Sequence, residues 1–166
     1  MKIVLIGFMG TGKTTLAPIL AKRFGLESIE MDDLIISKAG GKSIPGIFKA
    51  GGEAAFRELE SGVSKGLADT VNVVISTGGG VVSNEATIDY LTKGAIVIEL
   101  NASFDTVLKR IDPKMPRPLF QDPVEAQALY ERRKPLYSKY AAITVTTDDK
   151  SVDEVVEEII SKLQNQ

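Results

Sequence analysis

The sequence predicts an α/β protein in which a parallel sheet lies between two layers of helices, a three-layer α/β/α sandwich. Short apolar runs alternate with helical patterns along all 166 residues. The apolar runs are continuous rather than interrupted by polar residues, which is typical of parallel strands buried on both faces. No internal repeat, low-complexity tract or long linker divides the chain. We therefore expect residues 1–166 to form a single domain with a buried core.

Five segments are predicted to be strands because they are short and apolar, with β-branched residues prominent in most of them. In chain order they are residues 2–6, 28–31, 71–76, 95–100 and 143–146, of which the second has the weakest signal. Ligands of parallel sheets bind beyond the carboxyl ends of the strands. The residues that follow each strand are therefore candidates for a site.

Eight segments have the apolar spacing of helices. They are residues 13–24, 33–39, 44–50, 53–68, 84–93, 104–111, 124–140 and 151–164. The first places Leu16, Leu20 and Phe24 at helical spacing. The last begins with Ser151 and, three residues later, Glu154, which together match a capping box.

The first predicted strand runs directly into residues 7–14, Gly-Phe-Met-Gly-Thr-Gly-Lys-Thr, which match the P-loop pattern without a gap. Glycines let backbone amides turn toward phosphate oxygens, and the following helix presents its positive amino end. Lys13 is placed to reach the β- and γ-phosphates, and the Thr14 hydroxyl is placed to ligate Mg²⁺. The pattern predicts a nucleoside triphosphate site, the alternative being a glycine-rich turn that only starts a helix.

The composition excludes several kinds of chemistry. The chain has no cysteine and no histidine. A general base must therefore be a carboxylate or, less readily, Lys or Tyr, and a metal site must use oxygen ligands, which favours Mg²⁺. A formal net charge of −2 argues against a nucleic-acid partner. The first apolar run does not fit a signal peptide, and none approaches the ~20 residues of a membrane span, so we expect a cytoplasmic protein without a membrane partner.

Two further features follow predicted strands. The strand at 71–76 leads into Thr77 and three consecutive glycines at 78–80, whose amides a ligand could approach closely. Near the end of the strand at 28–31 lie the acids Glu30, Asp32 and Asp33, which suit water-mediated metal contacts or hydrogen bonds from hydroxyls. The simpler interpretations are a flexible turn and an acidic first turn of a helix.

Three basic features stand out against this slightly acidic background. Arg57 lies in a predicted helix, where it could simply pair with Glu53 or Glu60. Residues 109–119 combine cations with three prolines, which predicts a mobile lid, at about 111–124, that carries charge toward a phosphoryl group. Residues 132–134, Arg-Arg-Lys, form the third. For the last two the alternative is a solvated charged surface.

Five motifs in order resemble those of shikimate kinases. They are the P-loop at 7–14, Phe56-Arg57, Thr77 with glycines 78–80, Arg117-Pro118-Leu119, and Arg-Lys-Pro-Leu-Tyr at 133–137. The resemblance covers essentially the whole chain. It implies a nucleoside-monophosphate-kinase-like P-loop fold with a five-stranded parallel sheet. The implied reaction is Mg²⁺-dependent transfer of the ATP γ-phosphoryl to the 3-hydroxyl of shikimate, a step in chorismate and aromatic amino-acid biosynthesis.

The resemblance also implies which residues form the site. The ATP site would comprise Gly10, Thr11, Gly12, Lys13, Thr14 and Thr15 at the phosphates, Arg110 and Lys150 near adenine, and Arg117 from the lid. Shikimate would be held by Asp32, Arg57, Gly79, Gly80 and Arg133, with substrate-binding helices at about 32–61. The catalytic residues would be Lys13, Asp32 and Arg117, with Mg²⁺ bound by Thr14 and, through water, by Glu30. From helical spacing we also expect Glu60 to orient Arg57.

One position departs from the family pattern, which usually reads Asp-x-Asp where this chain has Glu30-Met31-Asp32. If the family pattern is aligned from Gly25 onward, Asp32 falls at the position of the substrate-binding acid. If the pattern is aligned backward from Ser43, Asp33 falls there instead, unless one residue of the glycine pair at 40–41 is an insertion relative to the family. We favour Asp32, because an insertion in a glycine-containing loop is the easier change. Both roles of this acid, general base or positioning group, stay open because phosphoryl transfer depends mostly on positioning and charge stabilisation.

Three alternatives remain to be weighed. Kinases of the same fold acting on gluconate or a nucleoside monophosphate would share the P-loop and lid, but would not need three glycines with two arginines facing a carboxylate. A GTPase switch would carry Asp-x-x-Gly and Asn-Lys-x-Asp motifs, and neither occurs in the sequence. The intact Lys13, Thr14, Arg57 and Arg117 argue against an inactive regulatory relative. We expect a monomer whose partners are ATP and shikimate.

Overall fold

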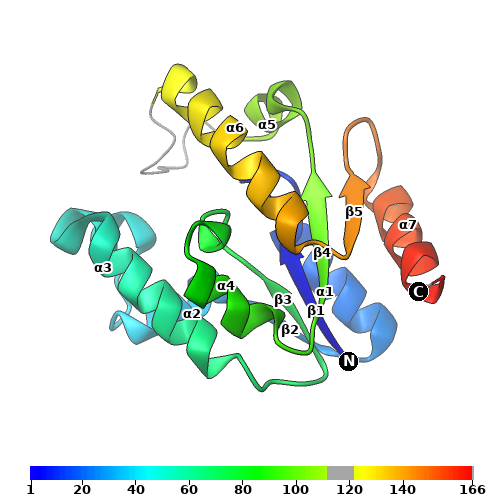
Figure 1. The fold of residues 1–166 in the computed structure, drawn as a ribbon, viewed down its shortest axis with the longest axis horizontal. Helices are drawn as coiled ribbons and strands as arrows, with labels where there is room; N and C mark the ends of the chain where they lie inside the picture. Colours follow the sequence, from blue (N-terminus) through cyan, green and yellow to red (C-terminus); the bar gives the residue numbers. More distant parts are fainter. Residues whose placement is uncertain (112–121, 166) are drawn as a thin grey trace.

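A computed structural model describes residues 1–111 and 122–165 of the chain (Figure 1). Its strands form one five-stranded sheet in the order β2-β3-β1-β4-β5, and each adjacent pair is parallel. The strands are β1 (Lys2–Ile6), β2 (Glu27–Glu30), β3 (Val73–Ser76), β4 (Ile96–Asn101) and β5 (Ile143–Thr146). Because the strands are parallel, their carboxyl ends meet at one end of the sheet.

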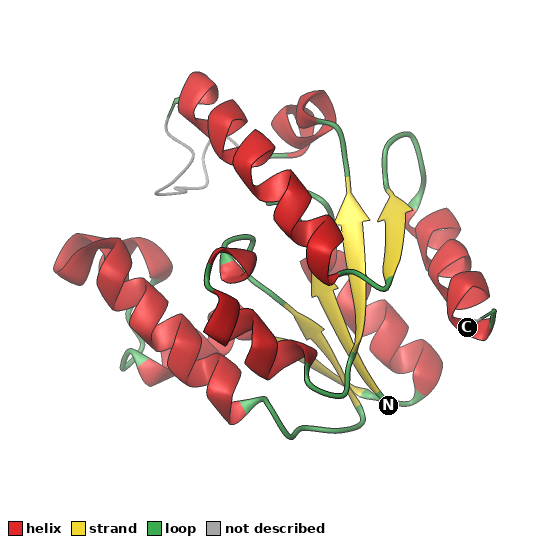
Figure 2. Cartoon of the chain, in the orientation of Figure 1, coloured by secondary structure: helices red, strands yellow, loops and turns green. Residues whose placement is uncertain are grey.

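Helices cover both faces of the sheet (Figure 2). They are α1 (Lys13–Phe24), α2 (Met31–Lys38), α3 (Ile44–Gly66), α4 (Glu85–Thr92), α5 (Phe104–Arg110), α6 (Pro123–Tyr140) and α7 (Val152–Gln164), with a short 3₁₀ helix, η1 (Val81–Ser83). Buried side chains of α1 and α7 pack on one face, and those of α2 to α6 belong to the core on the other face. The predicted three-layer α/β/α sandwich with a five-stranded parallel sheet is confirmed.

The central strand explains the continuous apolar runs of the sequence. Successive side chains of a strand point to opposite faces of the sheet. In β1, Ile3 and Leu5 belong to the core beneath α1 and α7, whereas Val4 and Ile6 belong to the opposite core. All four are fully buried. A strand with two buried faces must be apolar at every position, not at every second one.

The element boundaries follow the sequence prediction closely. The predicted strands at 2–6 and 143–146 and the helix at 13–24 coincide with β1, β5 and α1, and the other boundaries differ by a few residues. Two predicted helices, 44–50 and 53–68, form one element, α3, whose helical backbone is interrupted at Gly52 (φ 70°, ψ −171°). The 3₁₀ helix η1 was not predicted, because three residues carry no periodic pattern. The predicted lid lies outside the described residues except at its ends, and α6 begins at Pro123.

A buried lysine fixes α3 at the end of the sheet opposite to the site. Lys2 Nζ donates hydrogen bonds to the carbonyl oxygens of Leu67 (2.9 Å) and Ala68 (3.0 Å), just beyond the last turn of α3. Burial lowers the pKa of Lys2. The cation satisfies carbonyl groups that the helix itself leaves unpaired.

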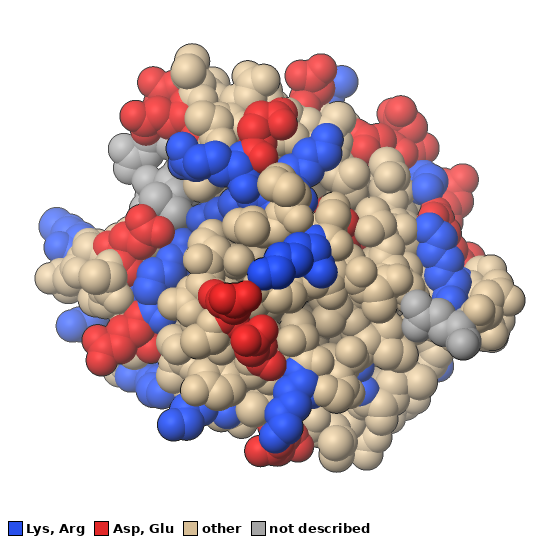
Figure 3. Space-filling view, in the orientation of Figure 1, with Lys and Arg blue, Asp and Glu red and all other residues tan. Residues whose placement is uncertain are grey.

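Basic and acidic side chains are interspersed on the face of the molecule shown in Figure 3. This distribution agrees with the small formal net charge of −2. Within residues 1–111 and 122–165, no helix has the length and apolar character needed to cross a membrane.

The close packing of the P-loop makes a first prediction. Gly7 has φ of 144°, and an added Cβ would collide with the carbonyl oxygen of Leu100 in β4. We expect Gly7→Ala to lower the free energy of unfolding by about 3 kcal/mol, because the new Cβ fits only if the backbone at residue 7 changes conformation or strand β4 moves. Urea denaturation measures the change. Gly66→Ala, where a Cβ meets nothing within 4 Å, is the matched control and should change stability by less than about 1 kcal/mol. Equal effects would contradict the packing described for Gly7.

Candidate active site

The P-loop connects β1 to α1 through three glycines with positive φ. Gly7, Gly10 and Gly12 have φ values of 144°, 77° and 99°, a region that L residues with side chains rarely adopt. Gly12 is the N-cap of α1, so the loop ends where the helix presents its unpaired amides. An anion placed here would meet backbone N–H groups and the positive end of α1.

Side chains of the loop hold its shape. Thr11 Oγ1 donates to the carbonyl oxygen of Phe8 at 2.8 Å. Lys13 Nζ donates to the carbonyl oxygens of Gly7 (2.7 Å) and Phe8 (2.9 Å). The ammonium group therefore lies across the loop, at the place where phosphate oxygens would arrive in a P-loop.

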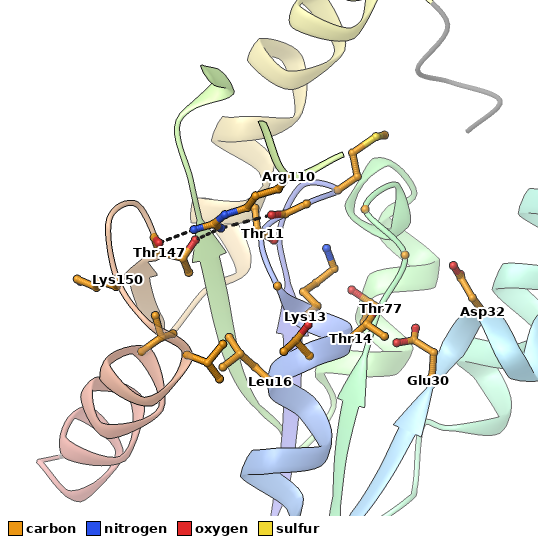
Figure 4. Close-up of a pocket in the computed structure, with 18 of the residues that line it drawn as sticks. Thr11, Lys13, Thr14, Leu16, Glu30, Asp32, Thr77, Arg110, Thr147 and Lys150 are labelled. Atoms are coloured by element: carbon orange, nitrogen blue, oxygen red, sulfur yellow. Dashed lines mark hydrogen bonds between the residues drawn. The ribbon is translucent and has the colours of Figure 1, made fainter. Parts of the chain in front are cut away.

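A cavity of about 600 Å³ opens at the carboxyl end of the sheet. Figure 4 shows Lys13 and Thr14 near its middle, Glu30 and Asp32 on one side, and Arg110, Thr147 and Lys150 on the other. The lining residues are Met9, Gly10, Thr11, Gly12, Lys13, Thr14, Thr15, Leu16, Glu30, Asp32, Thr77, Gly78, Gly79, Arg110, Thr147, Lys150, Ser151, Val152 and Val155. One cavity thus joins the P-loop to residues after β2, β3 and β5.

Two acids from the end of β2 line this cavity. Glu30 is the last residue of β2, and Asp32 lies in the first turn of α2. Glu30 Oε2 is buried, and no described residue gives it a hydrogen bond. Asp33 is exposed and does not line the cavity. The described residues contain no group of three or more acidic side chains that could hold a metal alone. A cation near Glu30 would therefore need further oxygens from Thr14, water or a ligand.

A partly buried ion pair lies beside the glycine turn, residues 78–80. Arg57 donates to Glu60 Oε2 at 2.7 Å and to the more exposed Glu53 at 3.1 Å. The Glu60 side chain is only 1% exposed, and its other oxygen, Oε1, has no hydrogen-bond partner among the described residues. Burial raises the pKa of Glu60 although the Arg57 charge lowers it. Glu60 holds the Arg57 guanidinium in place without satisfying all of its own hydrogen-bonding capacity.

The glycine turn is shaped by these side chains. A Cβ at Gly78 would lie 3.2 Å from Glu60 Oε1 and 3.6 Å from Asp32 Oδ1. A Cβ at Gly80 would collide with the Arg57 guanidinium. The absence of side chains therefore lets Arg57 and the two acids approach the backbone of the turn.

A second arginine, which is buried, comes from α6. Arg133 is 5% exposed, and its Nε has no hydrogen-bond partner among the described residues. Burial lowers the pKa of Arg133, and the like charge of Arg57 lowers it further. A buried and a partly buried guanidinium group whose like charges act on each other favour an anion close to both, and a carboxylate matches their planar geometry.

The far side of the cavity is built around Arg110. Its guanidinium donates to the Thr147 carbonyl oxygen at 2.7 Å and to Thr147 Oγ1 at 2.8 Å. Val152 and Val155 add apolar surface, and Lys150 is paired with Glu158 at 2.6 Å. A planar guanidinium group can stack on an aromatic ring, and the two valines could contact the same ring, so this side of the cavity suits an aromatic group of a ligand.

The structure gathers most of the sequence-predicted residues but not all. The cavity is lined by Gly10 to Thr15, Glu30, Asp32, Gly79, Arg110 and Lys150. Arg57 lies against Gly80 of the glycine turn, and Arg133 is close enough to Arg57 for their charges to interact. Arg117 lies outside the described residues. Sequence reasoning missed Thr147, although its position directly after β5 is the signal that could have found it.

Fold and site together define the class of this protein: a P-loop kinase for a small molecule that carries a negative charge. The family model for shikimate kinase matches residues 9–164. The chain belongs to the shikimate kinase family, transferases that phosphorylate shikimate using ATP.

Individual relatives agree with this assignment. The chain is 42% identical over 164 residues to a shikimate kinase of Lactococcus lactis subsp. lactis, covering 98% of both chains. A solved shikimate kinase of Acinetobacter baumannii in complex with shikimate superposes with a TM-score of 0.93 at 31% identity, with 99% of this chain and 93% of that chain covered. The solved enzyme of Aquifex aeolicus gives a TM-score of 0.86 at 38% identity, with 99% and 96% covered.

The ion pair beside the glycine turn makes a prediction about stability. Arg57→Met would leave the Glu60 carboxylate buried without this cation, so we expect the free energy of unfolding at neutral pH to fall by about 2–4 kcal/mol. The double variant Arg57→Met/Glu60→Leu removes both charges and should recover at least half of that loss. Urea denaturation of the wild type, the single variant and the double variant measures the three free energies of unfolding.

The same variants have an expected pH dependence. Burial raises the pKa of Glu60 in the folded state. In Arg57→Met that pKa rises further, so the folded variant binds a proton more readily than the unfolded chain. The difference in free energy of unfolding between the wild type and Arg57→Met should then shrink as the pH is lowered from neutral to about 5. The double variant should show no such recovery. A deficit that grows on acidification would contradict a buried, unpaired carboxylate.

Proposed function

We propose that this protein transfers the γ-phosphoryl group of Mg²⁺-bound ATP to the 3-hydroxyl of shikimate, giving shikimate 3-phosphate and ADP. The observation that carries the proposal is the continuity of one cavity. It joins the P-loop to Asp32 and to a glycine turn that is contacted by the partly buried Arg57, whose charge acts on the buried Arg133. A phosphoryl donor and a carboxylate-bearing acceptor would then meet near Lys13 and Asp32.

ATP would lie along the P-loop with its phosphates on the backbone amides of Gly10 to Thr15. Lys13 would exchange its two carbonyl partners for the β- and γ-phosphate oxygens, and would stabilise charge on the transferred group. Arg110 and Lys150 would contact the adenine side, next to Val152 and Val155.

Mg²⁺ fits the acidic corner of the cavity. The Thr14 hydroxyl and, through water, Glu30 would hold it beside the phosphates. The buried and unpartnered Glu30 Oε2 supports this role, since it lacks the hydrogen bond that a structural carboxylate would have. When bound there, the ion would supply positive charge that offsets the charge of the phosphates.

Shikimate would be held from three sides. Arg57 and Arg133 would bind its carboxylate, and amides of the glycine turn at Gly79 and Gly80 would add hydrogen bonds. Asp32 would accept hydrogen bonds from the ring hydroxyls. Glu60 would act as a positioning residue that keeps Arg57 directed toward the substrate.

The chemical step needs little covalent participation from the protein. Asp32 would orient the 3-hydroxyl and receive its proton as the oxygen attacks the γ-phosphorus, while the bond from that phosphorus to the β,γ-bridging oxygen breaks and ADP leaves. Arg117, outside the described residues, would bring positive charge from a lid at about 111–124. We propose that the protein works as a cytoplasmic monomer and binds neither nucleic acid nor a membrane.

A coupled ADP-release assay tests the function. Shikimate, quinate, gluconate, AMP and CMP are offered separately with Mg·ATP, beside a control without acceptor. Turnover should depend on shikimate and exceed that with every other acceptor at least about a hundredfold. A wrong acceptor would leave polar groups of the protein's binding site without a hydrogen-bond partner. Faster turnover with another acceptor would overturn the substrate, and Lys13→Ala turning over at the wild-type rate would overturn the P-loop assignment.

Gly80 provides a prediction about substrate binding. Its backbone angles (φ −91°, ψ −6°) suit alanine, so only the collision with the Arg57 guanidinium opposes Gly80→Ala. We expect a folded variant whose KM for shikimate rises about tenfold while its KM for ATP changes less than about twofold. Steady-state kinetics measure both constants, with Gly66→Ala as the control. Equal increases in both constants would contradict a carboxylate site at Arg57.

Glu30 provides a prediction about the metal. Glu30→Gln keeps the length of the side chain and removes its charge, so the Mg²⁺ concentration for half-maximal activity should rise about tenfold. Asp33→Asn, an exposed neighbour outside the cavity lining, is the matched control and should leave it unchanged. Identical Mg²⁺ dependence in both variants would exclude Glu30 from the metal site.

A further inference from the structure

Helix α6 contacts the glycine turn through a tyrosine. Tyr137 Oη donates a hydrogen bond to the carbonyl oxygen of Gly79 at 2.6 Å. The Tyr137 side chain is buried, with 3% of the residue exposed. Tyr137 therefore belongs to the interior between α6 and the turn, not to the solvent-facing side of the helix.

The hydrogen bond acts on one peptide unit. The Gly79 carbonyl and the Gly80 N–H belong to the same planar trans peptide, in which the two groups point in opposite directions. Fixing the carbonyl toward Tyr137 therefore directs the Gly80 N–H away from the Tyr137 hydroxyl. Among the hydrogen bonds between described residues, none is donated by the amides of residues 78–80. These amides are available to a ligand.

The turn needs such a restraint because its residues are glycines. Three consecutive residues without Cβ have a wide choice of backbone conformation in solution. The neighbouring backbone bonds, Val81 N to Gly78 O at 3.3 Å and Ser83 N to Gly80 O at 3.0 Å, close η1 but do not involve the Gly79 carbonyl. The tyrosine supplies the restraint from 58 residues further along the chain.

The tyrosine and the second arginine come from the same face of α6. Arg133 and Tyr137 are four residues apart, so they lie one above the other on the helix. Both are buried, and the Arg133 charge acts on the Tyr137 phenol. Burial raises the pKa of this phenol above its usual value, so its O–H remains a donor at neutral pH.

We propose that Tyr137 is a positioning residue for shikimate binding: its hydroxyl fixes the Gly79–Gly80 peptide so that the turn offers its amides to the substrate carboxylate beside Arg57 and Arg133. A single helix, α6, then supplies one cation to the anion site and sets the direction of its backbone donors. The inference rests on the proposed function, because it assigns a role within the shikimate site.

Tyr137→Phe tests the inference, since it removes only the hydroxyl. Tyr130→Phe is the matched control: Tyr130 is a buried tyrosine of the same helix whose hydroxyl donates to the Ala102 carbonyl at 2.8 Å, away from the turn. Both variants lose one buried hydrogen bond to a backbone carbonyl. A role in structure alone should therefore affect their unfolding midpoints and their kinetics alike.

The KM values for shikimate and ATP are measured for the wild type and both variants. We expect Tyr137→Phe to raise the KM for shikimate about three- to tenfold, the loss of one buried hydrogen bond, with the KM for ATP within about twofold. Tyr130→Phe should leave both within about twofold. A Tyr137→Phe variant with the constants of Tyr130→Phe would overturn the inference and leave the function standing. A wild type without shikimate-dependent turnover would overturn the function, and the inference with it.

Discussion

The close approach of two glycine-containing turns is the constraint on which the site depends. The P-loop follows β1 and the glycine turn follows the adjacent strand β3, so the two turns leave the sheet side by side. Thr77 connects the end of β3 to β1 just before the two turns begin, since its amide (3.3 Å) and its hydroxyl (2.8 Å) both donate to the Leu5 carbonyl. A Cβ at Gly79 would lie 3.4 Å from the Met9 amide nitrogen. The two turns thus lie close enough together for residues of both to line one cavity.

The same end of the sheet concentrates unsatisfied polar groups. Among the described residues, four buried side-chain atoms have no hydrogen-bond partner: Glu30 Oε2, Glu60 Oε1, Ser76 Oγ and Arg133 Nε. All four belong to residues at the end of β2 or β3 or beside the glycine turn. Buried polar groups without partners reduce stability, and proteins retain them mainly where function requires them. Their grouping supports a site prepared for charged ligands, whose binding would restore the missing interactions.

Much of the fold could be predicted because its signals are local. The uninterrupted apolar run of β1, the helical spacing of α1 and the capping box of Ser151 and Glu154 each depend on neighbouring residues. The contacts within the site depend on packing between distant elements. Arg57 could be placed on a helix from the sequence, but its approach to Gly80 requires the three-dimensional arrangement of α3 and β3. The Tyr137 contact with Gly79 joins residues 58 positions apart, and no periodicity reveals it.

The central claim is that Arg57, Arg133 and the glycine turn recognise a carboxylate. Calorimetric titration of the protein with shikimate, and separately with its uncharged methyl ester, tests this claim most directly. The two ligands share the ring and every hydroxyl, so they differ only at the group assigned to Arg57 and Arg133. The account predicts that the ester binds at least about thirtyfold more weakly, the loss of one or more charge-assisted hydrogen bonds. Equal affinity for the two ligands would contradict it and would place the carboxylate elsewhere.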